Sequence, residues 1–152
     1  MFRFPVSLLL LLCFSLATHA QSPGVAYDST LARTLGADDY GMRMYTLVLL
    51  KPGPRTDLAK TARDSAFAGH MANIGRLAEE GQLFLAGPFA KNEHYSGLFV
   101  FNTRTAEATE ALLLTDPAVA CGALAYELYP WYGSAAVQQV PALHERLQKK
   151  GF

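Results

Sequence analysis

The sequence predicts an α+β fold of the ferredoxin-like type, in which a four-stranded antiparallel sheet carries two helices on one face. Four short runs of apolar, β-branched and aromatic residues are bounded by glycine and proline, as strands commonly are. Helical stretches lie between the first and second runs and between the third and fourth. The second and third runs are joined by a link too short to hold a helix, which indicates an antiparallel hairpin. The element order is therefore β-α-β-β-α-β, the split βαβ arrangement.

The first strand is expected at 44–50 (MYTLVLL), where the sequence KPGP follows it. Its almost continuous apolar character is typical of a central strand that is covered on both faces. The first core helix is expected to follow Asp57, as its N-cap, and to run to about Glu80. Gly81 then ends this helix, because glycine readily adopts the left-handed conformation found after a helix.

Apolar residues recur in this helix at spacings of three and four, which predicts one buried face. These residues are Phe67, Met71, Ile74 and Ala78. His70 lies on the flank of that face. Gly69 and Gly75 also lie inside the helix, where each costs about 1 kcal/mol relative to alanine. We therefore expect another backbone to approach the helix closely at these glycines.

The second and third strands form the expected hairpin. The second strand is expected at 83–86, closed by Gly87 and Pro88, and the third at 97–102 (GLFVFN). Thr105 is a suitable N-cap for a second helix that runs through Leu114. The dipeptide DP at 116–117 breaks this helix. The fourth strand is then expected at 124–129, with the proline at position 130 stopping it.

Segments on both sides of this core are also expected to form helices. Residues 29–35 suit a short helix, with Asp28 or Ser29 as N-cap and Gly36 as its end. A final helix is expected at 142–150, with Pro141 in its first turn.

The N-terminus has the three parts of a secretory signal peptide: an arginine at position 3, an apolar run, and the small-residue exit Thr18-His19-Ala20. The apolar run is shorter than the roughly 20 residues that a membrane span needs. We therefore predict an exported protein, periplasmic or secreted, that begins at Gln21 and has no stable membrane insertion after cleavage. The alternative is an uncleaved membrane anchor. The predicted organisation is a signal peptide at 1–20, an extension at 21–42, the ferredoxin-like domain at 43–132 and a helical tail at 133–152.

The charge and cysteine content exclude several classes of partner and cross-link. Lys plus Arg number 13 and Asp plus Glu number 13, so the formal net charge is zero and nucleic-acid binding is not expected. Signal cleavage would remove Cys13 and leave Cys121 alone, which excludes an intramolecular disulfide. Because the helices cover one sheet face and the remaining segments are short, we predict a homodimer through the open face.

The order and spacing of several short motifs resemble those of the YCII-related (YciI-like) domain family, a member of the dimeric α+β barrel group. The motifs are a histidine on the first helix, Glu80-Gly81 at its end, Gly87-Pro88-Phe89, a strand led by Gly97, Asp116-Pro117, and Pro130-Trp131. The resemblance covers the segment from Arg43 to Trp131. It implies a ferredoxin-like dimer with a His–Asp pair at its active site, here His70 and Asp116.

The chemistry of this pair would be general acid–base catalysis. A carboxylate that accepts a hydrogen bond from one imidazole nitrogen leaves the other nitrogen to take or give a proton near neutral pH. The structural alternatives are a histidine at a helix–sheet edge and an aspartate in a turn. Arg63, two helical turns before His70, could bind a substrate carboxylate, or could simply be a surface arginine. Gly87 and Pro88 could shape the pocket wall, or could only end a strand.

Other polar and aromatic residues give weaker indications. Glu93 and His94 lack a paired spacing that would bind a metal, so no metal site is expected. The aromatic residues after the last strand (Tyr129, Trp131 and Tyr132) suit a core or interface role better than a ligand pocket.

The first hypothesis is an isomerase- or lyase-like enzyme that acts on a small organic acid without a metal or organic cofactor. The alternative is a non-catalytic domain that binds a small molecule or serves as a dimeric scaffold.

Overall fold

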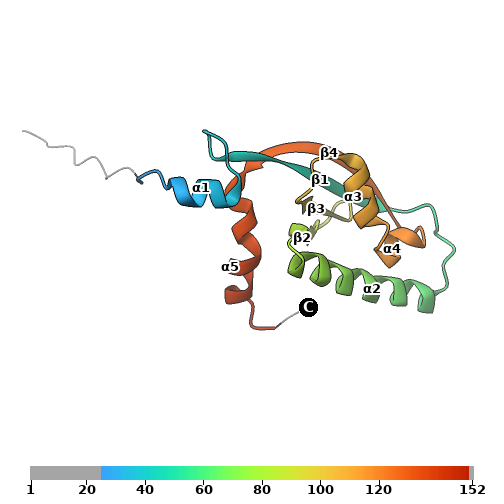
Figure 1. The fold of residues 1–152 in the computed structure, drawn as a ribbon. Coiled ribbons are helices and arrows are strands. Elements are labelled where there is room, and N and C mark those ends of the chain that lie inside the picture. The colour runs from blue at the N-terminus through green and yellow to red at the C-terminus, as the bar shows by residue number, and fades with distance from the viewer. Residues whose placement is uncertain (1–24, 151–152) are drawn as a thin grey trace, which may run out of the picture.

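The structure, a computed structural model, describes residues 25–150, so the predicted signal peptide lies outside the described residues. The elements in chain order are α1 (Ser29–Leu35), β1 (Met42–Pro52), α2 (Lys60–Glu79), β2 (Leu83–Pro88), β3 (Gly97–Phe101), α3 (Ala106–Leu113), α4 (Pro117–Ala120), β4 (Leu124–Ser134), the 3₁₀ helix η1 (Ala135–Gln139) and α5 (Val140–Leu147) (Figure 1). The strands form one sheet in the order β2-β3-β1-β4. All neighbouring strands are antiparallel. The predicted ferredoxin-like fold is confirmed by this order and pairing.

The central position predicted for the first strand is confirmed, because β1 pairs with β3 on one side and β4 on the other. β1 and β4 pair along eleven residues each and form a long arch over the rest of the sheet (Figure 1). The prediction that Pro130 stops the last strand is wrong, since β4 continues through it, with Pro130 opposite Thr46. β4 is an edge strand, where a proline nitrogen can face away from the neighbouring strand at no cost in hydrogen bonds.

Helices α2, α3 and α4 cover one face of the sheet, as predicted for the two core helices. Their buried side chains pack with those of alternate strand residues into the main core: Val48, Leu50, Ala66, Leu77, Leu83, Phe99, Phe101, Leu113, Ala118, Val119, Ala123 and Leu124. Val48 pairs with Phe99 across β1 and β3, and both side chains face the helices. This packing holds α2 against β2 and β3, and so fixes the position of the residues on α2.

The opposite face of the sheet is covered only at one end. Tyr45, Phe84 and Val100 form a smaller core there, against which Trp131 and Val137 pack. Val137 belongs to η1, so the C-terminal segment covers more of this face than the sequence indicated. Farther along the same face, the leucines of β1 and β3 (Leu47, Leu49 and Leu98) are only half-buried. We call this half-covered surface the open face.

The N-cap predictions are confirmed for two helices and wrong for α2. Asp28 accepts hydrogen bonds from the backbone at the start of α1, and Thr105 does so for α3. Helix α2, however, begins at Lys60 without a side-chain cap, because Asp57 instead pairs with the side chain of Arg55 at 2.8 Å.

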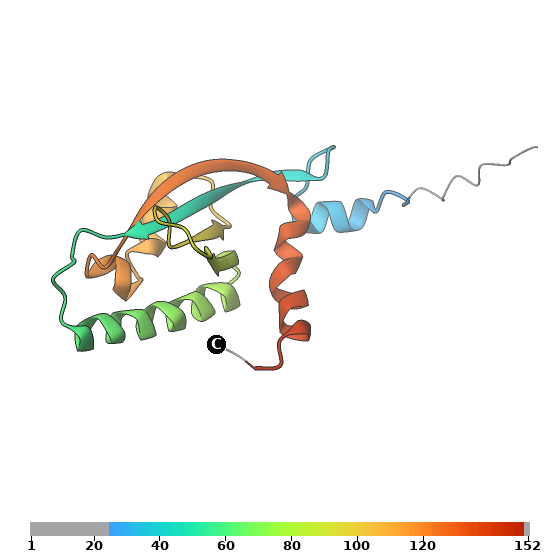
Figure 2. The ribbon, with the colours of Figure 1, turned by 180° about the vertical axis from the view of Figure 1, so that it is seen from behind.

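Helices α1 and α2 are each followed by a glycine as expected, but α4 and α5 differ from the prediction. Gly36 and Gly81 have positive φ angles after α1 and α2. Residues 117–120 form the short helix α4, where only a connection to the last strand was expected. Helix α5 ends at Leu147, earlier than predicted. In both views α5 stands at the end of the sheet where β4 ends, beside the last turns of α2 (Figures 1 and 2).

The buried face of α2 differs from the predicted one by one residue along the helix. The buried residues are Ala66, His70, Asn73 and Leu77, whereas Met71 is 42% exposed. The polar side chains of His70 and Asn73 are tolerated in this position because both find hydrogen-bond partners. The apolar stripe that begins at Phe67 lies beside the buried face and lines cavities instead.

Candidate functional site

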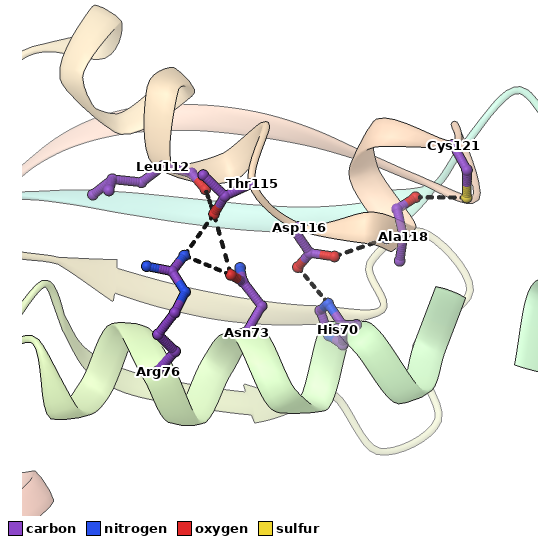
Figure 3. Close-up of polar contacts among 8 residues, drawn as sticks. All are labelled: His70, Asn73, Arg76, Leu112, Thr115, Asp116, Ala118 and Cys121. Carbon is purple, nitrogen blue, oxygen red and sulfur yellow. Dashed lines mark hydrogen bonds and ion pairs between the residues drawn. The ribbon is translucent and has the colours of Figure 1, made fainter. Parts of the chain in front are cut away.

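His70 and Asp116 form a buried hydrogen-bonded pair. Nδ1 of His70, on α2, lies 2.6 Å from Oδ2 of Asp116 (Figure 3). The two residues are 8% and 1% exposed. The imidazole ring lies between two phenylalanines, stacked near Phe99 at 5.8 Å and edge-on to Phe67 at 5.9 Å between ring centres. The structure thus brings together the two residues that the sequence singled out, although 46 positions separate them.

The Asp116 carboxylate is fixed by the start of α4. Asp116 is the N-cap of this helix, and its Oδ1 accepts a hydrogen bond of 2.9 Å from the backbone N–H of Ala118. Pro117 occupies the first turn, where a missing N–H is harmless. The Asp-Pro dipeptide therefore both separates α3 from α4 and aims a carboxylate at α2. With one oxygen held by the cap, Oδ2 remains for the imidazole.

Gly69 explains how α4 comes so close to α2. A Cβ atom at Gly69 would lie 2.7 Å from Cγ of Pro117, well inside normal contact distance. The close approach that the sequence indicated at this glycine is therefore present, although it involves a proline ring and not a backbone. Gly75 is different, because a Cβ atom there would meet nothing within 4 Å. The approach expected at Gly75 is absent.

A second set of polar contacts lies one turn farther along α2. Oδ1 of Asn73 lies 3.1 Å from the hydroxyl of Thr115 and accepts a hydrogen bond of 2.7 Å from Arg76 (Figure 3). Arg76 also donates to the Thr115 hydroxyl at 2.9 Å. Sequence reasoning missed these residues. Their signal was the spacing of three residues from His70 to Asn73 and again from Asn73 to Arg76, which places each side chain next to the one before it on the helix surface.

The His70 ring lines a cavity of about 310 Å³ between α2, β2 and β3. We call it the His70 cavity. Gly87 and Pro88 belong to its wall, as the sequence suggested they could, together with Leu50, Phe67, Met71, Ile74, Ala86, Ser96, Gly97, Phe99 and Leu124. Because Nδ1 is bound to Asp116, Nε2 is the ring nitrogen left for a molecule in this cavity.

Arg63 does not belong to the residues that line the His70 cavity. It is exposed on α2, and its guanidinium carbon lies 5.4 Å from the ring centre of Phe67. The lining contains no lysine or arginine. Ser96 contributes the one hydroxyl among the lining residues, and its side chain makes no hydrogen bond within residues 25–150.

The remaining candidates lie away from this cavity. Cys121 is half-buried, and its Sγ lies 3.6 Å from the carbonyl oxygen of Ala118. Glu93 and His94 are exposed in the hairpin loop. Within residues 25–150 no group of three or more His, Cys, Asp or Glu side chains is placed to hold a metal ion. In the same range no helix is long and apolar enough to span a bilayer.

A separate polar cluster lies on the open face around Glu127. Its carboxylate accepts hydrogen bonds from Lys51 at 2.7 Å, Tyr129 at 2.9 Å and Tyr95 at 3.1 Å. The Lys51 ammonium, followed by the two phenol hydroxyls, holds the pKa of Glu127 below its usual value. The same contacts raise the pKa of Tyr129, because the nearby carboxylate disfavours a phenolate. The cluster joins β1, β4 and the hairpin loop.

Comparison with known proteins gives a limited result. No protein-family model matches the sequence, and no curated protein matches it either. Among solved structures, the chain is similar to 5-chloro-2-hydroxyhydroquinone dehydrochlorinase from Burkholderia phenoliruptrix AC1100, determined in complex with 2,5-dihydroxybenzoquinone. The identity is 17%, the match covers 57% of this chain and 92% of that one, and the TM-score is 0.44. The fold assigned to the chain therefore rests on its own strand order and pairing.

Proposed function

We propose that this chain is a YCII-related enzyme that moves a proton at a carbon atom next to a carbonyl group, with His70 as the base. One observation carries the proposal. His70, joined to the buried Asp116 at 2.6 Å, forms part of the wall of a cavity large enough for a small organic molecule. A buried imidazole with a fixed carboxylate partner and access to a cavity is an arrangement that favours general acid–base catalysis.

The hydrogen bonds indicate how the proton would move. With Asp116 accepting from Nδ1–H, the free lone pair of the ring is on Nε2, which would act as the base. When Nε2 takes a proton from carbon, the electrons of that C–H bond form an enolate, and the Asp116 carboxylate stabilises the imidazolium. Return of the proton to another carbon completes an isomerisation. Loss of a leaving group from the adjacent carbon completes an elimination instead.

The lining indicates the kind of substrate. Apart from His70 and Ser96, the wall consists of apolar side chains and glycines, and contains no lysine or arginine. A small organic acid would therefore have to keep its carboxylate outside this cavity, because an unpaired charge is costly to bury. A neutral carbonyl compound fits better. The Ser96 hydroxyl is available to donate a hydrogen bond to its oxygen, where negative charge develops.

The test is hydrogen–deuterium exchange at the α-carbon of 2-butanone in heavy water, followed by NMR. Purified protein should accelerate the exchange, and His70→Gln should lower the catalysed rate about 10²- to 10⁴-fold, the usual contribution of a general base. His94→Gln, in the exposed hairpin loop, is the matched control and should behave as the wild type. Equal rates for wild type and His70→Gln would refute catalysis by His70. If 2-butanone shifts the His70 signals without any exchange, the chain is a non-catalytic binding domain.

We also infer that two copies of the chain associate through the open face. The half-buried leucines of β1 and β3 support this, as does Tyr129 of β4, which is 44% exposed on the same face. A surface of this kind on a four-stranded sheet is commonly buried by a second sheet.

Export remains part of the proposal as well. N-terminal sequencing of protein from the expressing cells should find Gln21 first.

A further inference from the structure

A second cavity, of about 460 Å³, lies between the last turns of α2, strand β2 and helix α5. We call it the α5 cavity. Its apolar lining comes from all three elements: Met71, Ile74, Ala78, Leu83, Phe84, Leu85, Ala86, Val140 and Pro141. Figures 1 and 2 both show α5 standing beside the end of α2. The cavity is therefore formed where the C-terminal helix meets the edge of the core domain.

The α5 cavity adjoins the His70 cavity. Met71, Ile74 and Ala86 line both of them, so the two cavities meet at these three side chains. Met71 is 42% exposed, and a methionine side chain has three rotatable bonds with which it can adapt to a ligand. A molecule with its reactive group at His70 can therefore extend along α2 into the second cavity.

The apolar stripe of α2 supports the same inference. Phe67 lines the His70 cavity, Met71 and Ile74 line both cavities, and Ala78 lines the α5 cavity. The stripe does not form the buried face of the helix, which consists of residues 66, 70, 73 and 77. Apolar surface left in contact with water is unfavourable, and a ligand that covers it gains the corresponding free energy.

Gly75 provides an independent observation. It lies inside α2, where glycine costs about 1 kcal/mol relative to alanine. Its φ angle is not positive, and a Cβ atom there would meet nothing within 4 Å, so neither backbone conformation nor packing requires glycine. Gly75 lines the α5 cavity. A larger side chain at this position would project into space that the fold leaves empty.

We propose that the α5 cavity binds the unbranched hydrocarbon chain of a substrate whose carbonyl group lies at His70. The inference rests on the proposed function, because it adds a substrate class to the same site. The substrate would be a linear, neutral-tailed carbonyl compound. Two carboxylates in the lining, Glu79 and Glu145, outnumber its one histidine, His144, and so disfavour an anionic group at the far end of the chain.

The experiment uses linear ketones from 2-butanone to 2-nonanone and measures their affinity from the NMR signals of His70. In the wild type, the affinity should rise about fourfold for each added methylene group once the chain enters the α5 cavity. Gly75→Leu should remove this rise, so that the ratio of the 2-nonanone to the 2-butanone affinity collapses. Ala72→Leu is the matched control. It adds the same side chain to an exposed position of α2 outside both cavities, and should keep the wild-type ratio.

The outcomes separate this inference from the proposed function. An affinity that does not rise with chain length, or a rise that persists in Gly75→Leu, overturns the chain-binding role of the α5 cavity while His70-dependent exchange of 2-butanone can still stand. If Gly75→Leu removes the rise in affinity with chain length, but the wild type catalyses no hydrogen–deuterium exchange, the chain-binding role is supported and the catalytic role is refuted. Leucine in place of glycine favours the helix, and circular dichroism should show that the variant is folded.

Discussion

The hydrogen bond between His70 and Asp116 determines which imidazole nitrogen carries the free lone pair. Asp116 is buried, and the α4 cap occupies its Oδ1, while its Oδ2 contacts Nδ1 of His70. The carboxylate therefore selects the tautomer with hydrogen on Nδ1. This selection leaves the Nε2 lone pair for the proton abstraction that we propose.

Asp116→Asn should reverse the tautomer. The amide oxygen can keep the cap on the Ala118 N–H, while the amide NH₂ now donates to Nδ1 of His70. Hydrogen then moves to Nε2, which can no longer act as a base. We expect the catalysed exchange rate to fall about 10²- to 10⁴-fold, with ¹⁵N NMR showing hydrogen on Nε2. A variant with the wild-type tautomer and an unchanged rate would show that Asp116 does not orient the ring.

Glu127 should make the stability of the protein depend on pH. Lys51 and two tyrosines hold its pKa below the usual value in the folded state. A lowered pKa stabilises the folded state above the unfolded-state value of about 4.3, and this contribution disappears as the pH falls through the lower folded-state value. In Glu127→Gln the contribution is absent at every pH. The difference in free energy of unfolding between wild type and variant, measured in urea, should therefore shrink as the solution is acidified below about pH 4. A difference that is constant with pH would show that the carboxylate charge contributes nothing.

At the scale of elements, α2 and α4 meet at one tight contact that sets the site. Gly69 of α2 faces the ring of Pro117, which follows the catalytic candidate Asp116. Gly75 in the same helix serves as the comparison position, because a Cβ atom there would meet nothing within 4 Å. Both glycines lie in the interior of α2, so alanine should improve helix propensity by about the same amount at each.

The free energies of unfolding of Gly69→Ala and Gly75→Ala should therefore differ only by the cost of the contact with Pro117. Gly75→Ala should raise the free energy of unfolding by up to about 1 kcal/mol. Gly69→Ala should lie about 1–3 kcal/mol below it, because the new methyl group forces Pro117 and α4 away. Urea denaturation measures both. The His70 signals should also shift in Gly69→Ala and stay in place in Gly75→Ala. Equal stabilities would show that α4 moves away without cost.

The sequence predicted the elements whose signals are local. Glycine and cap residues marked the ends of α1 and α3 correctly, because their hydrogen bonds involve neighbours in sequence. The strand that continues through Pro130 could not be predicted, since a proline is tolerated only on an edge strand and strand order is a property of the whole sheet. The buried face of α2 was misplaced because apolar spacing cannot show that His70 and Asn73 find polar partners on distant segments.

The candidate site depends on how segments that are distant in sequence meet in the whole molecule. The pairing of His70 with Asp116 was expected from the resemblance to the YCII-related family, and the fold permits it by placing α2 beside the segment before β4. The cavities could not be predicted, because their walls combine α2 and β2 with β3 in one case and with α5 in the other. Arg63 was considered from its helical spacing alone, and that spacing does not bring it to the wall.

Association of two copies through the open face is a property of the whole molecule that can be tested. At one end of this face, η1 covers Tyr45, but Leu49 lies farther along and is only half-buried. Leu49 is paired with Leu98 on one side and Glu127 on the other, near the middle of the exposed sheet. A stable interface of ordinary size covers about 800 Å² on each partner, an area that has to include such a central position.

Leu49→Glu should convert the proposed dimer into a monomer. A carboxylate placed at Leu49 would be buried between the two sheets and would lie next to Glu127, so it should disfavour association strongly. Sedimentation equilibrium should give twice the chain mass for the wild type and the single mass for the variant. Leu114→Glu is the control, because Leu114 is 61% exposed after α3, on the side of the sheet that the helices cover, and should stay dimeric. Circular dichroism should show that both variants are folded. A wild type that sediments as a monomer would mean that the open face serves another partner or none.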